Sequence, residues 1–410
     1  MRHNRYQVFC IFLVSLLLAS MFLACGERSR TTTSDTQRRE LPRQGVDLLI
    51  RAQQAFRQHN YPAALALTDS VARFNPQLAD LHFLRGRIFT ETNQLRAARE
   101  AYEKVVAVDP DYQGAWMNLG NVLLDQGKPA EALEKYQREE RLAPAANVYV
   151  QIGRAYAKLK KFTQADQAYR RAIQLDSTQA TAYMWLGQLY EAEGHWEQAV
   201  RFSEQGLRLA PENPNYLYLA ATQLIKVERY ARAIRYLEEV LRQEPWHAGA
   251  HYNLGQAYMR TGRTRLGERN LAVADSLQRI DRRIEDLRIF TEMHPEALEN
   301  WTTLGDTLRQ YGRFDEALRA YESALLLEPY NLSLQTNTAT LLFHLGETET
   351  AINRYLVILQ QNPTYTDVWL NLGVAYAMTG KNEEARWAWQ NLLKYEPNHQ
   401  LAKQYLARLK

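Results

Sequence analysis

Apolar side chains recur three and four positions apart through most of the chain, which is the spacing of an amphipathic helix. Short glycine-containing turns interrupt this pattern, and many of the apolar runs end at a proline. Proline cannot continue a helix because it lacks the amide N–H, so each of these prolines marks a helix end. The pattern predicts an all-α chain of short helices joined by turns, without strands.

Three segments display a unit that repeats, at residues 115–144, 182–211 and 368–397. Each contains a bulky residue, a leucine followed by glycine, and a glycine-containing turn. An alanine, an aromatic or apolar residue and a closing proline then follow. One such unit cannot bury its apolar face alone, so neighbouring units are expected to stack.

This unit resembles the tetratricopeptide repeat, a helix–turn–helix motif of 34 residues. The resemblance implies an all-α, right-handed solenoid or superhelix of about ten repeats. One step between repeats is 33 residues, and the step from Ala248 to Leu298 is 50 residues. The expected repeats begin at Gly45, Ala79, Gln113, Ala146, Ala180, Pro214, Ala248, Leu298, Leu332 and Thr366.

Small residues occupy two fixed positions of the repeat. The eighth position holds glycine or alanine, and the twentieth holds alanine or, once, Gly267. The two helices of a repeat are expected to cross closely there, because a larger side chain would push them apart. Bulky residues at the fourth position, such as Trp116 and Trp369, are expected to fill the space beside the crossing.

The long seventh repeat contains an apolar seam. Val273, Leu277, Ile280, Ile284 and Leu287 recur at steps of four and three, which predicts a heptad seam on one extended helix over residues 264–293. The extra helical residues are expected either to turn the following repeats into a new superhelix direction or to be offset by a kink that restores the stack. Two interpretations of the seam are possible. In the first, it binds a partner or a second copy of the chain through residues 273–287. In the second, it packs on the chain's own repeats. The second interpretation is favoured, because an exposed apolar seam is a liability.

The N-terminus has the layout of a secretory signal peptide. Arg2 and Arg5 precede an apolar run at residues 8–24. A retained membrane helix is the alternative interpretation. The sequence FLAC, ending at Cys25 and followed by Gly26, resembles the lipobox of bacterial lipoproteins.

The lipobox resemblance implies that Cys25 becomes the first residue of the mature protein and carries the lipid anchor. Cys10 lies in the segment to be removed, so no second thiol remains for a disulfide or a cysteine metal site. In the same family, Gly26 after the cysteine implies the outer membrane rather than the inner one. The predicted location is therefore the bacterial cell envelope, with the lipid-anchored chain facing the periplasm.

These features predict six parts of the chain. The parts are a signal peptide at residues 1–24, a lipidated cysteine and flexible tether at 25–44, repeats one to seven at 45–281, a helical insertion extending repeat seven at 282–297, repeats eight to ten at 298–399, and a capping helix at 400–410.

The sequence contains no local signature of a catalytic site, a phosphate-binding loop or a cofactor site, so we predict no enzyme and no cofactor. His247 and His251 have a spacing that can hold a metal, but no carboxylate or cysteine accompanies them, so no metal site is predicted. Removing residues 1–24 lowers the net charge from +4 to +2, and no basic stripe is present. Nucleic acid is therefore not a predicted partner.

The resemblance further implies that the first helix of each repeat lines a concave groove. Along the chain, the residues expected to line this groove form a polar, basic zone followed by an apolar zone. We expect them to hold an extended or helical peptide, unless they serve only as solvated residues and packing between repeats. The basic zone consists of Arg87, Asn118, Asn121, Gln151, Arg154 and Lys158, and the apolar zone of Met184, Tyr218 and Tyr252 with Trp185, Gln188 and Gln256 beside it.

The leading functional prediction is a non-enzymatic lipoprotein that acts as a scaffold or adaptor for envelope proteins and peptides. It resembles lipoproteins that assist secretin pilotage, outer-membrane-protein assembly or recruitment of cell-wall hydrolases. The alternative is a self-assembling structural envelope protein that uses the long helix at residues 264–293.

Overall fold

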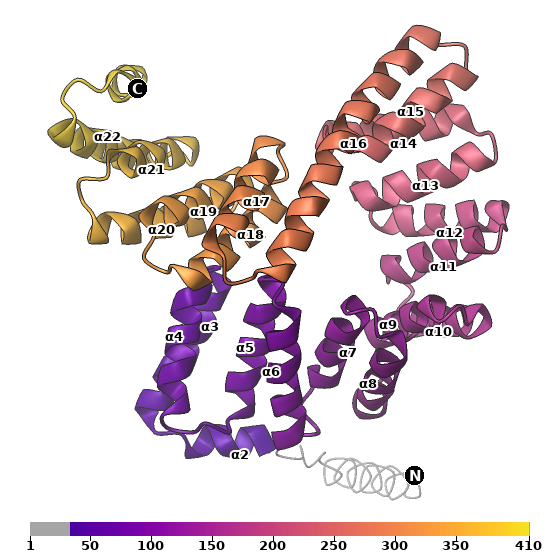
Figure 1. Ribbon diagram of the computed structural model, residues 1–410, viewed down its shortest axis with the longest axis horizontal. Helices are drawn as coiled ribbons and strands as arrows, with labels where there is room; N and C mark the ends of the chain where they lie inside the picture. The colour runs from indigo at the N-terminus through magenta and orange to yellow at the C-terminus, as the bar shows by residue number, and fades with distance from the viewer. Residues whose placement is uncertain (1–32, 410) are drawn as a thin grey trace, which may run out of the picture.

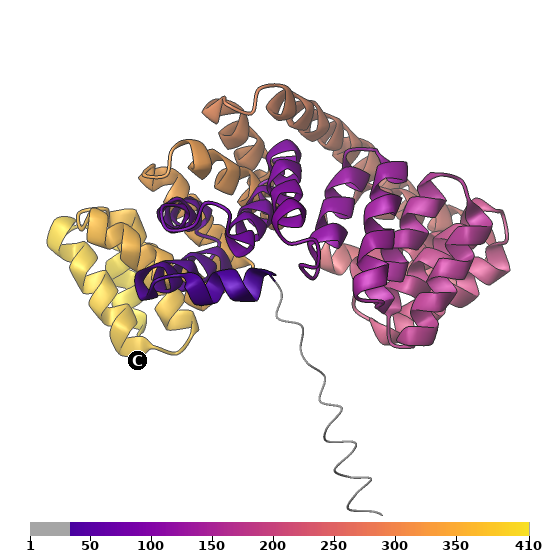
Figure 2. The same cartoon turned by 90° about the horizontal axis from the view of Figure 1, so that it is seen from below.

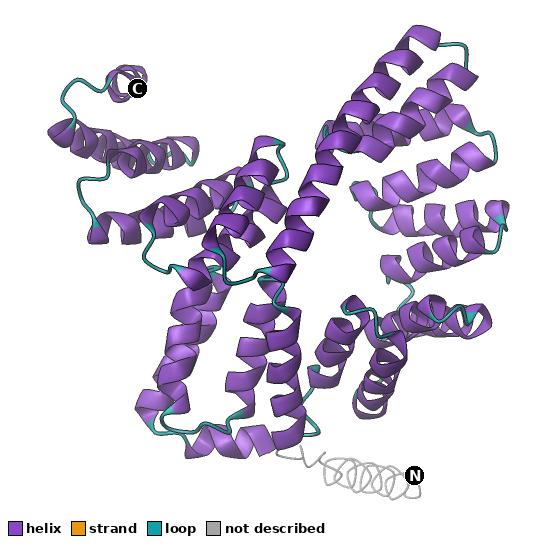
Figure 3. Ribbon diagram, viewed as in Figure 1, coloured by secondary structure: helices purple, strands orange, loops and turns teal. Residues whose placement is uncertain are grey.

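The computed structural model describes residues 33–409, so the predicted signal peptide and Cys25 lie outside the described residues. Residues 33–409 form 22 helices, arranged as ten helix–turn–helix pairs flanked by one helix at each end (Figure 3). The predicted all-α superhelix of tetratricopeptide type is confirmed. None of the helices in this part of the chain combines the length and apolar character needed to cross a bilayer.

The first helices of the ten pairs are α3 (Arg43–Arg57), α5 (Ala79–Glu91), α7 (Ala115–Asp125), α9 (Ala146–Lys158), α11 (Ala180–Ala192), α13 (Pro214–Lys226), α15 (Ala248–Arg260), α17 (Leu298–Gln310), α19 (Leu332–His344) and α21 (Thr366–Met378). The second helices are α4 (Tyr61–Ala72), α6 (Leu95–Val108), α8 (Pro129–Leu142), α10 (Phe162–Leu175), α12 (Trp196–Leu209), α14 (Tyr230–Gln243), α16 (Thr264–Met293), α18 (Phe314–Leu327), α20 (Thr348–Gln361) and α22 (Asn382–Tyr395). The flanking helices are α2 (Thr33–Glu40) and α23 (Gln400–Arg408).

The glycine at the eighth position marks the close crossing of the two helices in a repeat. A Cβ atom added to Gly120 would lie 2.5 Å from the ring of Tyr136, which is fully buried on the second helix of the same repeat. A Cβ on Gly86 would lie 2.6 Å from the ring of Tyr102 in the same way. The expected close crossing is present, and an aromatic ring at position 24 fills it.

The bulky side chains at the fourth position have a different role from the expected one. The indole Nε1 of Trp116 donates a hydrogen bond to the carbonyl of Pro110 at 2.8 Å, and Trp369 does the same to Pro363 at 2.8 Å. These rings therefore tie the first helix of a repeat to the end of the preceding repeat. The position-24 aromatics fill the space beside the glycine, so the expectation for the fourth position is wrong in this respect.

Every turn between paired helices contains one residue in the left-handed backbone region. Six of these residues are glycines, and the others are His59, Asn93, Lys160 and Glu228, with φ between 54° and 58°. An L side chain in this region costs about 1–2 kcal/mol because its Cβ approaches the following carbonyl.

Replacing Glu228 with glycine is therefore expected to stabilise the protein by about 0.5–1 kcal/mol, after allowing for the greater freedom of glycine in the unfolded chain. Gly194→Ala is the matched opposite change, because Gly194 has φ of 78° and an added Cβ would meet no atom within 4 Å. It should destabilise the protein by a similar amount. Urea unfolding of both variants tests this pair, and equal midpoints for all three proteins would contradict it.

The second part of the predicted tether is a helix, contrary to the expectation of flexibility for residues 25–44. Helix α2 is held on α5 by Arg38, whose guanidinium contacts both carboxylate oxygens of Asp80 at 2.5 and 2.6 Å. Asp80 is only 4% exposed and also accepts a hydrogen bond from the hydroxyl of Tyr112 at 2.8 Å. Composition suggested a solvated spacer because it does not reveal this buried acceptor on a later repeat.

Helix α16 runs without interruption over 30 residues and ends at Met293, so the predicted helical insertion at residues 282–297 is helical except for its last four residues. Ile284 on this helix is 1% exposed, and Ile280 and Leu287 pack against the same apolar core as repeats eight to ten. Arg313 adds an ion pair across this interface, with Nη1 2.8 Å from a carboxylate oxygen of Asp281. This half of the seam packs on the chain's own repeats, as the favoured interpretation predicted.

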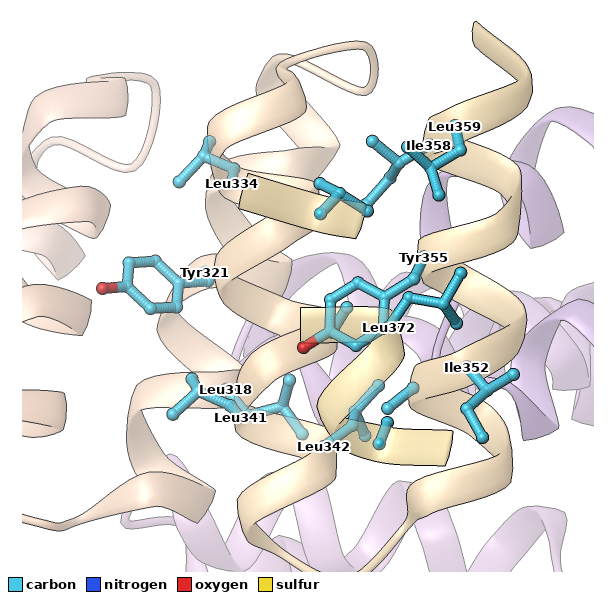
Figure 4. Close-up of a cluster of buried hydrophobic side chains, with 14 of the residues drawn as sticks. Leu318, Tyr321, Leu334, Leu341, Leu342, Ile352, Tyr355, Ile358, Leu359 and Leu372 are labelled. Carbon is cyan, nitrogen blue, oxygen red and sulfur yellow. The ribbon is translucent and has the colours of Figure 1, made fainter. Parts of the chain in front are cut away.

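The apolar core of repeats eight to ten is continuous. Figure 4 shows side chains of α19 and α20, among them Leu342 and Tyr355, filling the space between these helices, whereas Tyr321 of α18 points to the other side, toward Gly305 of α17. Helix α23 covers the end of this core with the buried Ala402, and the ring of Tyr405 lies 5.2 Å from that of Trp389.

After α16, the chain turns back over its own start (Figure 1 and Figure 2). Leu326 on α18 packs against the apolar cluster of repeats one and two. The hydroxyl of Ser323 donates to the carbonyl of Thr92 at 3.0 Å, across 231 sequence positions. Arg354 on α20 donates to the carbonyl of Gln58 at 3.2 Å. We call the contact made by Gln58, Thr92, Ser323, Leu326 and Arg354 the closure junction.

Candidate functional site

The residues predicted to line the groove lie on the first helices of repeats two to seven, from α5 to α15. Arg154 on α9 donates from Nη1 to Oε1 of Gln151 at 2.7 Å. Its guanidinium lies 5.0 Å from the ring centre of Trp185 on the next first helix, α11. A cation over an indole face is attracted by the negative charge of the ring face. The structure thus joins the predicted basic and apolar zones through one contact.

Several predicted groove residues are accessible to a partner. Arg87, Lys158 and Gln188 are exposed, Gln256 is half-buried, and Tyr252 is 46% exposed. An exposed tyrosine ring offers a large apolar contact area at a small entropy cost, which suits it as an anchor for a peptide.

The two asparagines of the basic zone are engaged within the protein. Asn118 donates from Nδ2 to the carbonyl of Gly114 at 2.7 Å, at the start of α7. Asn121 accepts a hydrogen bond from the hydroxyl of Tyr136 at 2.9 Å. A peptide in the groove would have to compete for the Nδ2 donor of Asn118, whereas the amide of Asn121 keeps its own N–H donors.

Tyr218 forms a small cluster with residues of the seventh repeat. Asn253 donates from Nδ2 to the Tyr218 hydroxyl at 3.2 Å, and the ring of His247 lies 4.4 Å from the tyrosine ring. Burial raises the pKa of Tyr218, so its hydroxyl keeps its proton and remains available as a donor. Sequence analysis missed Asn253, although it occupies the same sixth position as Asn118 and Gln151.

Met184 does not belong to the exposed groove, and its prediction as an apolar anchor is wrong. Its side chain is only 4% exposed, and its sulfur would lie 2.6 Å from a Cβ atom added to Gly206 on α12. A thioether fills irregular gaps well, which explains its use at this helix crossing. The sequence feature that could have revealed this burial is Gly206, because a glycine within the second helix of a repeat allows a neighbouring side chain to approach closely.

The two histidines with metal-capable spacing both have structural roles. His247 caps α15 by accepting from the backbone N–H of Ala250 at 3.2 Å. His251 lies 3.0 Å from the carbonyl of Pro245 and 2.9 Å from Oδ1 of Asn270. Within residues 33–409 no group of three or more His, Cys, Asp or Glu side chains is placed to hold a metal ion.

A cavity of about 380 Å³ lies beside the closure junction. Helix α4 and the turn before it form one wall, and α18, α19 and α20 form the others. Its walls include the buried ion pair of Glu322 and Arg354. Sequence analysis did not find this cavity, because its walls come from opposite ends of the repeat array. A second hollow, lined in part by Ala97, lies between α4, α5 and α6.

The family model described as the cilia and flagella-associated protein 70 C-terminal domain, a tetratricopeptide repeat family, matches residues 51–293, more than half of the chain. The chain belongs to this tetratricopeptide repeat family. Two further tetratricopeptide repeat models match residues 298–331 and 355–386 of the same protein. Arrays of these repeats are protein–protein interaction domains, and this chain is one of them.

Among curated proteins, this tetratricopeptide repeat protein is similar to the human protein O-mannosyl-transferase TMTC3. The two are 23% identical over 209 residues, which cover 50% of this chain and 23% of that protein. The RNA polymerase-associated protein CTR9 of Caenorhabditis elegans is 24% identical over 81% of this chain and 34% of its own length. The chain thus spans only about a quarter to a third of these relatives.

Among solved structures, this repeat protein is similar to PilW, described as a widely conserved type IV pilus biogenesis factor, with a TM-score of 0.47 and 16% identity. That match covers 51% of this chain and 97% of PilW. The structure of pilF from Pseudomonas aeruginosa matches with a TM-score of 0.44 and 19% identity, over 50% of this chain and 94% of that one.

Proposed function

We propose that this tetratricopeptide repeat protein is a non-enzymatic scaffold of the bacterial cell envelope, anchored by a lipid on Cys25 and facing the periplasm from the outer membrane. The observation that carries the proposal is the N-terminal sequence, in which a charged start and an apolar run lead to Cys25 followed by Gly26. Several acyl chains hold a protein firmly on a membrane, whereas one chain holds it only weakly.

The groove is proposed to bind envelope proteins or peptides. Trp185 and the exposed Tyr252 supply aromatic anchors, and Arg154 supplies a charge beside them. The amides of Gln188 and Gln256 supply donors and acceptors for a peptide main chain. Aromatic and arginine side chains carry a large share of the binding energy at protein interfaces, so this part of the groove is expected to dominate affinity.

Replacing Cys25 with serine is expected to abolish labelling by a clickable fatty acid and to release the protein from membranes. The physical reason is that the thiol is the only proposed attachment point for lipid. Cys10→Ser is the matched control, because the chain has only these two cysteines and Cys10 lies in the removed segment. Persistent labelling of the Cys25→Ser variant would contradict the anchor.

Photo-crosslinking in living cells tests the groove. A crosslinker placed at Tyr218 or at Arg154 is expected to capture an envelope protein, because both residues lie among the proposed anchors. The same crosslinker at Arg201, an exposed residue on the second helix α12, is the control. Capture of the same protein from Arg201, or no capture from either groove position, would contradict the groove as the binding site.

Self-assembly is the second candidate function. The predicted seam offers little for it, because Ile284 is buried within the chain. The observation that favours it is the end of the same helix, where Ile289, Phe290 and Met293 are 49%, 50% and 67% exposed. Size measurement across a range of concentrations separates the two candidates, and a monomer at every concentration removes self-assembly.

A further inference from the structure

The closure junction buries little apolar surface. Leu326 on α18 packs against the apolar cluster of repeats one and two, and the cavity of about 380 Å³ lies beside this contact. The hydrogen bonds of Ser323 with Thr92 and of Arg354 with Gln58 add to the contact. Because little apolar area is buried, a small free energy separates the closed junction from an open one. The charge of a single side chain can therefore shift this equilibrium.

A histidine–glutamate pair lies beside the closure junction and also joins the two ends of the array. His59, in the turn between α3 and α4, has its Nε2 3.3 Å from Oε1 of Glu347, which directly precedes α20. The Nδ1 of His59 lies 3.1 Å from the hydroxyl of Tyr61. Burial raises the pKa of Tyr61, so this hydroxyl keeps its proton and can donate it to Nδ1 of a neutral ring. The Nε2–H group then points to Glu347, and protonation of the ring turns this contact into an ion pair.

Negative charge gathers where the two ends meet. The pKa of Tyr61 is raised first by burial and then by the negative charges of Glu322, Glu91 and Glu347, while Arg354 acts in the opposite direction. Glu91 belongs to repeat two, whereas Glu322 and Glu347 belong to repeats eight and nine. Closure therefore brings like charges together, and an added positive charge between them favours the closed state.

The permanent cations in this region do not balance its carboxylates. Arg87 on α5 has its guanidinium 4.2 Å from the ring centre of Phe56, whose ring lies 5.6 Å from that of Tyr61. Arg87 and Arg354 thus provide two permanent positive charges against the three carboxylates that act on Tyr61. His59 is the group that can supply the missing positive charge.

Protonation favours the closed state. A histidine ring changes its charge between about pH 5 and 8, where glutamate side chains are ordinarily ionised. The protonated ring of His59 meets Glu347 in the closed state and water in the open state, so closure takes up a proton. Burial raises the pKa of Glu322 to about 7, and this carboxyl would meet water if the ends separated, so it acts in the same direction. The closed state is therefore favoured as the pH falls and disfavoured as it rises.

We propose that the closure junction responds to pH: in mild acid the protonated His59 pairs with Glu347 and holds the two ends of the array together, and as the pH rises the pair loses its charge and the ends separate. Separation changes the curvature of the array and therefore the spacing of the first helices that line the groove. This inference does not depend on the proposed envelope function, because neither the lipid anchor nor the aromatic part of the groove takes part in it.

The test uses the full chain in a mild detergent, with spin labels on unnatural amino acids at Gln54 and Gln360. Both positions are exposed, and they lie on α3 and α20, on opposite sides of the junction. Pulsed electron resonance measures the distribution of distances between the labels. We expect a short distance to dominate near about pH 5.5, and the population of a longer distance to grow at least about threefold by about pH 8. Circular dichroism should show the same helix content at both pH values, which separates opening from unfolding.

Two variants remove the pair. Glu347→Gln keeps the size of an exposed side chain and removes its charge, and His59→Gln removes the group that takes up the proton. Each should reduce the growth of the open population between the two pH values at least about twofold. His195→Gln is the matched control, because His195 also lies in a turn beside a glutamate, with Nδ1 4.0 Å from Oε2 of Glu193, but belongs to repeat five. It should leave the response to pH unchanged.

Four outcomes would overturn the proposal. These are equal distance distributions at the two pH values, an open population that grows as the pH falls, a wild-type response in the folded Glu347→Gln variant, and an equal reduction of the response by His195→Gln. The third result would assign the pH dependence to Glu322 instead of to the histidine–glutamate pair.

Discussion

Replacing Arg354 with alanine is expected to separate repeats one and two from repeats eight and nine. The guanidinium connects the carbonyl of Gln58 on one side with the carboxylate of Glu322 and the hydroxyl of Thr338 on the other. Its side chain is 12% exposed and that of Glu322 is 1% exposed. Removing one partner of a buried ion pair leaves the other charge uncompensated, at a cost of about 3–5 kcal/mol.

The loss of stability in the Arg354→Ala variant should depend on pH. Burial raises the pKa of Glu322 from its ordinary value of 4.5 to about 7, although Arg354 acts in the opposite direction. A carboxyl group with a raised pKa favours the folded state below pH 4.5, and this contribution disappears as the pH rises through about 7. Without Arg354, which lowers the pKa of Glu322, the buried carboxyl can stay protonated near about pH 5, whereas near about pH 8 it must either carry an uncompensated charge or take up a proton from dilute solution, and both are unfavourable. The destabilisation is therefore expected to be larger at the higher pH.

Small-angle X-ray scattering and thermal unfolding at both pH values measure this effect. The variant should show a larger radius of gyration with unchanged helix content, because the stacked repeats themselves remain intact. Arg319→Ala is the matched control, since it removes an exposed arginine from α18. Scattering curves that coincide for the wild type and the Arg354→Ala variant at both pH values would refute a closing role for Arg354.

Replacing Gly120 with valine is expected to destabilise the third repeat by about 2–3 kcal/mol. The added Cβ alone would lie 2.5 Å from the ring of Tyr136, which is fully buried and has no room to withdraw. Valine forms helices more readily than glycine does, so helix propensity acts in the opposite direction and cannot explain a loss. A loss of stability in the Gly120→Val variant would therefore be due to the close crossing of α7 and α8.

The double variant Gly120→Val/Tyr136→Leu separates a steric clash from other causes. Leucine occupies less space than tyrosine, and repeat six already places Leu237 at this position opposite Ala221. We expect the double variant to be more stable than the sum of the two single variants predicts, by about 1 kcal/mol. Urea unfolding of the four proteins measures this coupling, and strictly additive losses would argue against the clash.

The sequence predicted those features that depend on contacts within a repeat or between neighbours. The glycine at position eight signalled the helix crossing, and the seam around Ile284 signalled the continuous helix α16. These signals are reliable because each repeat contacts mainly its neighbours, so a local pattern carries most of the information. The candidate groove was predicted on the same basis, although Met184 proved to be buried and Asn253 was overlooked.

The docking of α2 depends on a buried acceptor that composition does not reveal. Arg38 and Asp80 are 42 positions apart, and nothing near Arg38 in the sequence marks the carboxylate that receives it. A short polar segment rich in arginine has the composition of a solvated spacer. Only the tertiary structure shows that Asp80 is withdrawn from water and that the segment before the first repeat is ordered by it.

By itself, the sequence determined an all-α array of paired helices, the close crossings within the pairs, and the long helix that follows the seventh first helix. Only the tertiary structure decided that the array closes on itself, bringing Gln58 to Arg354 across 296 positions. The physical reason is that a small rotation accumulates at every repeat, so the relative position of distant repeats depends on the sum of many angles. The cavity at the closure junction, with the partnerless oxygen of Glu322 in its wall, exists only as a result of that sum.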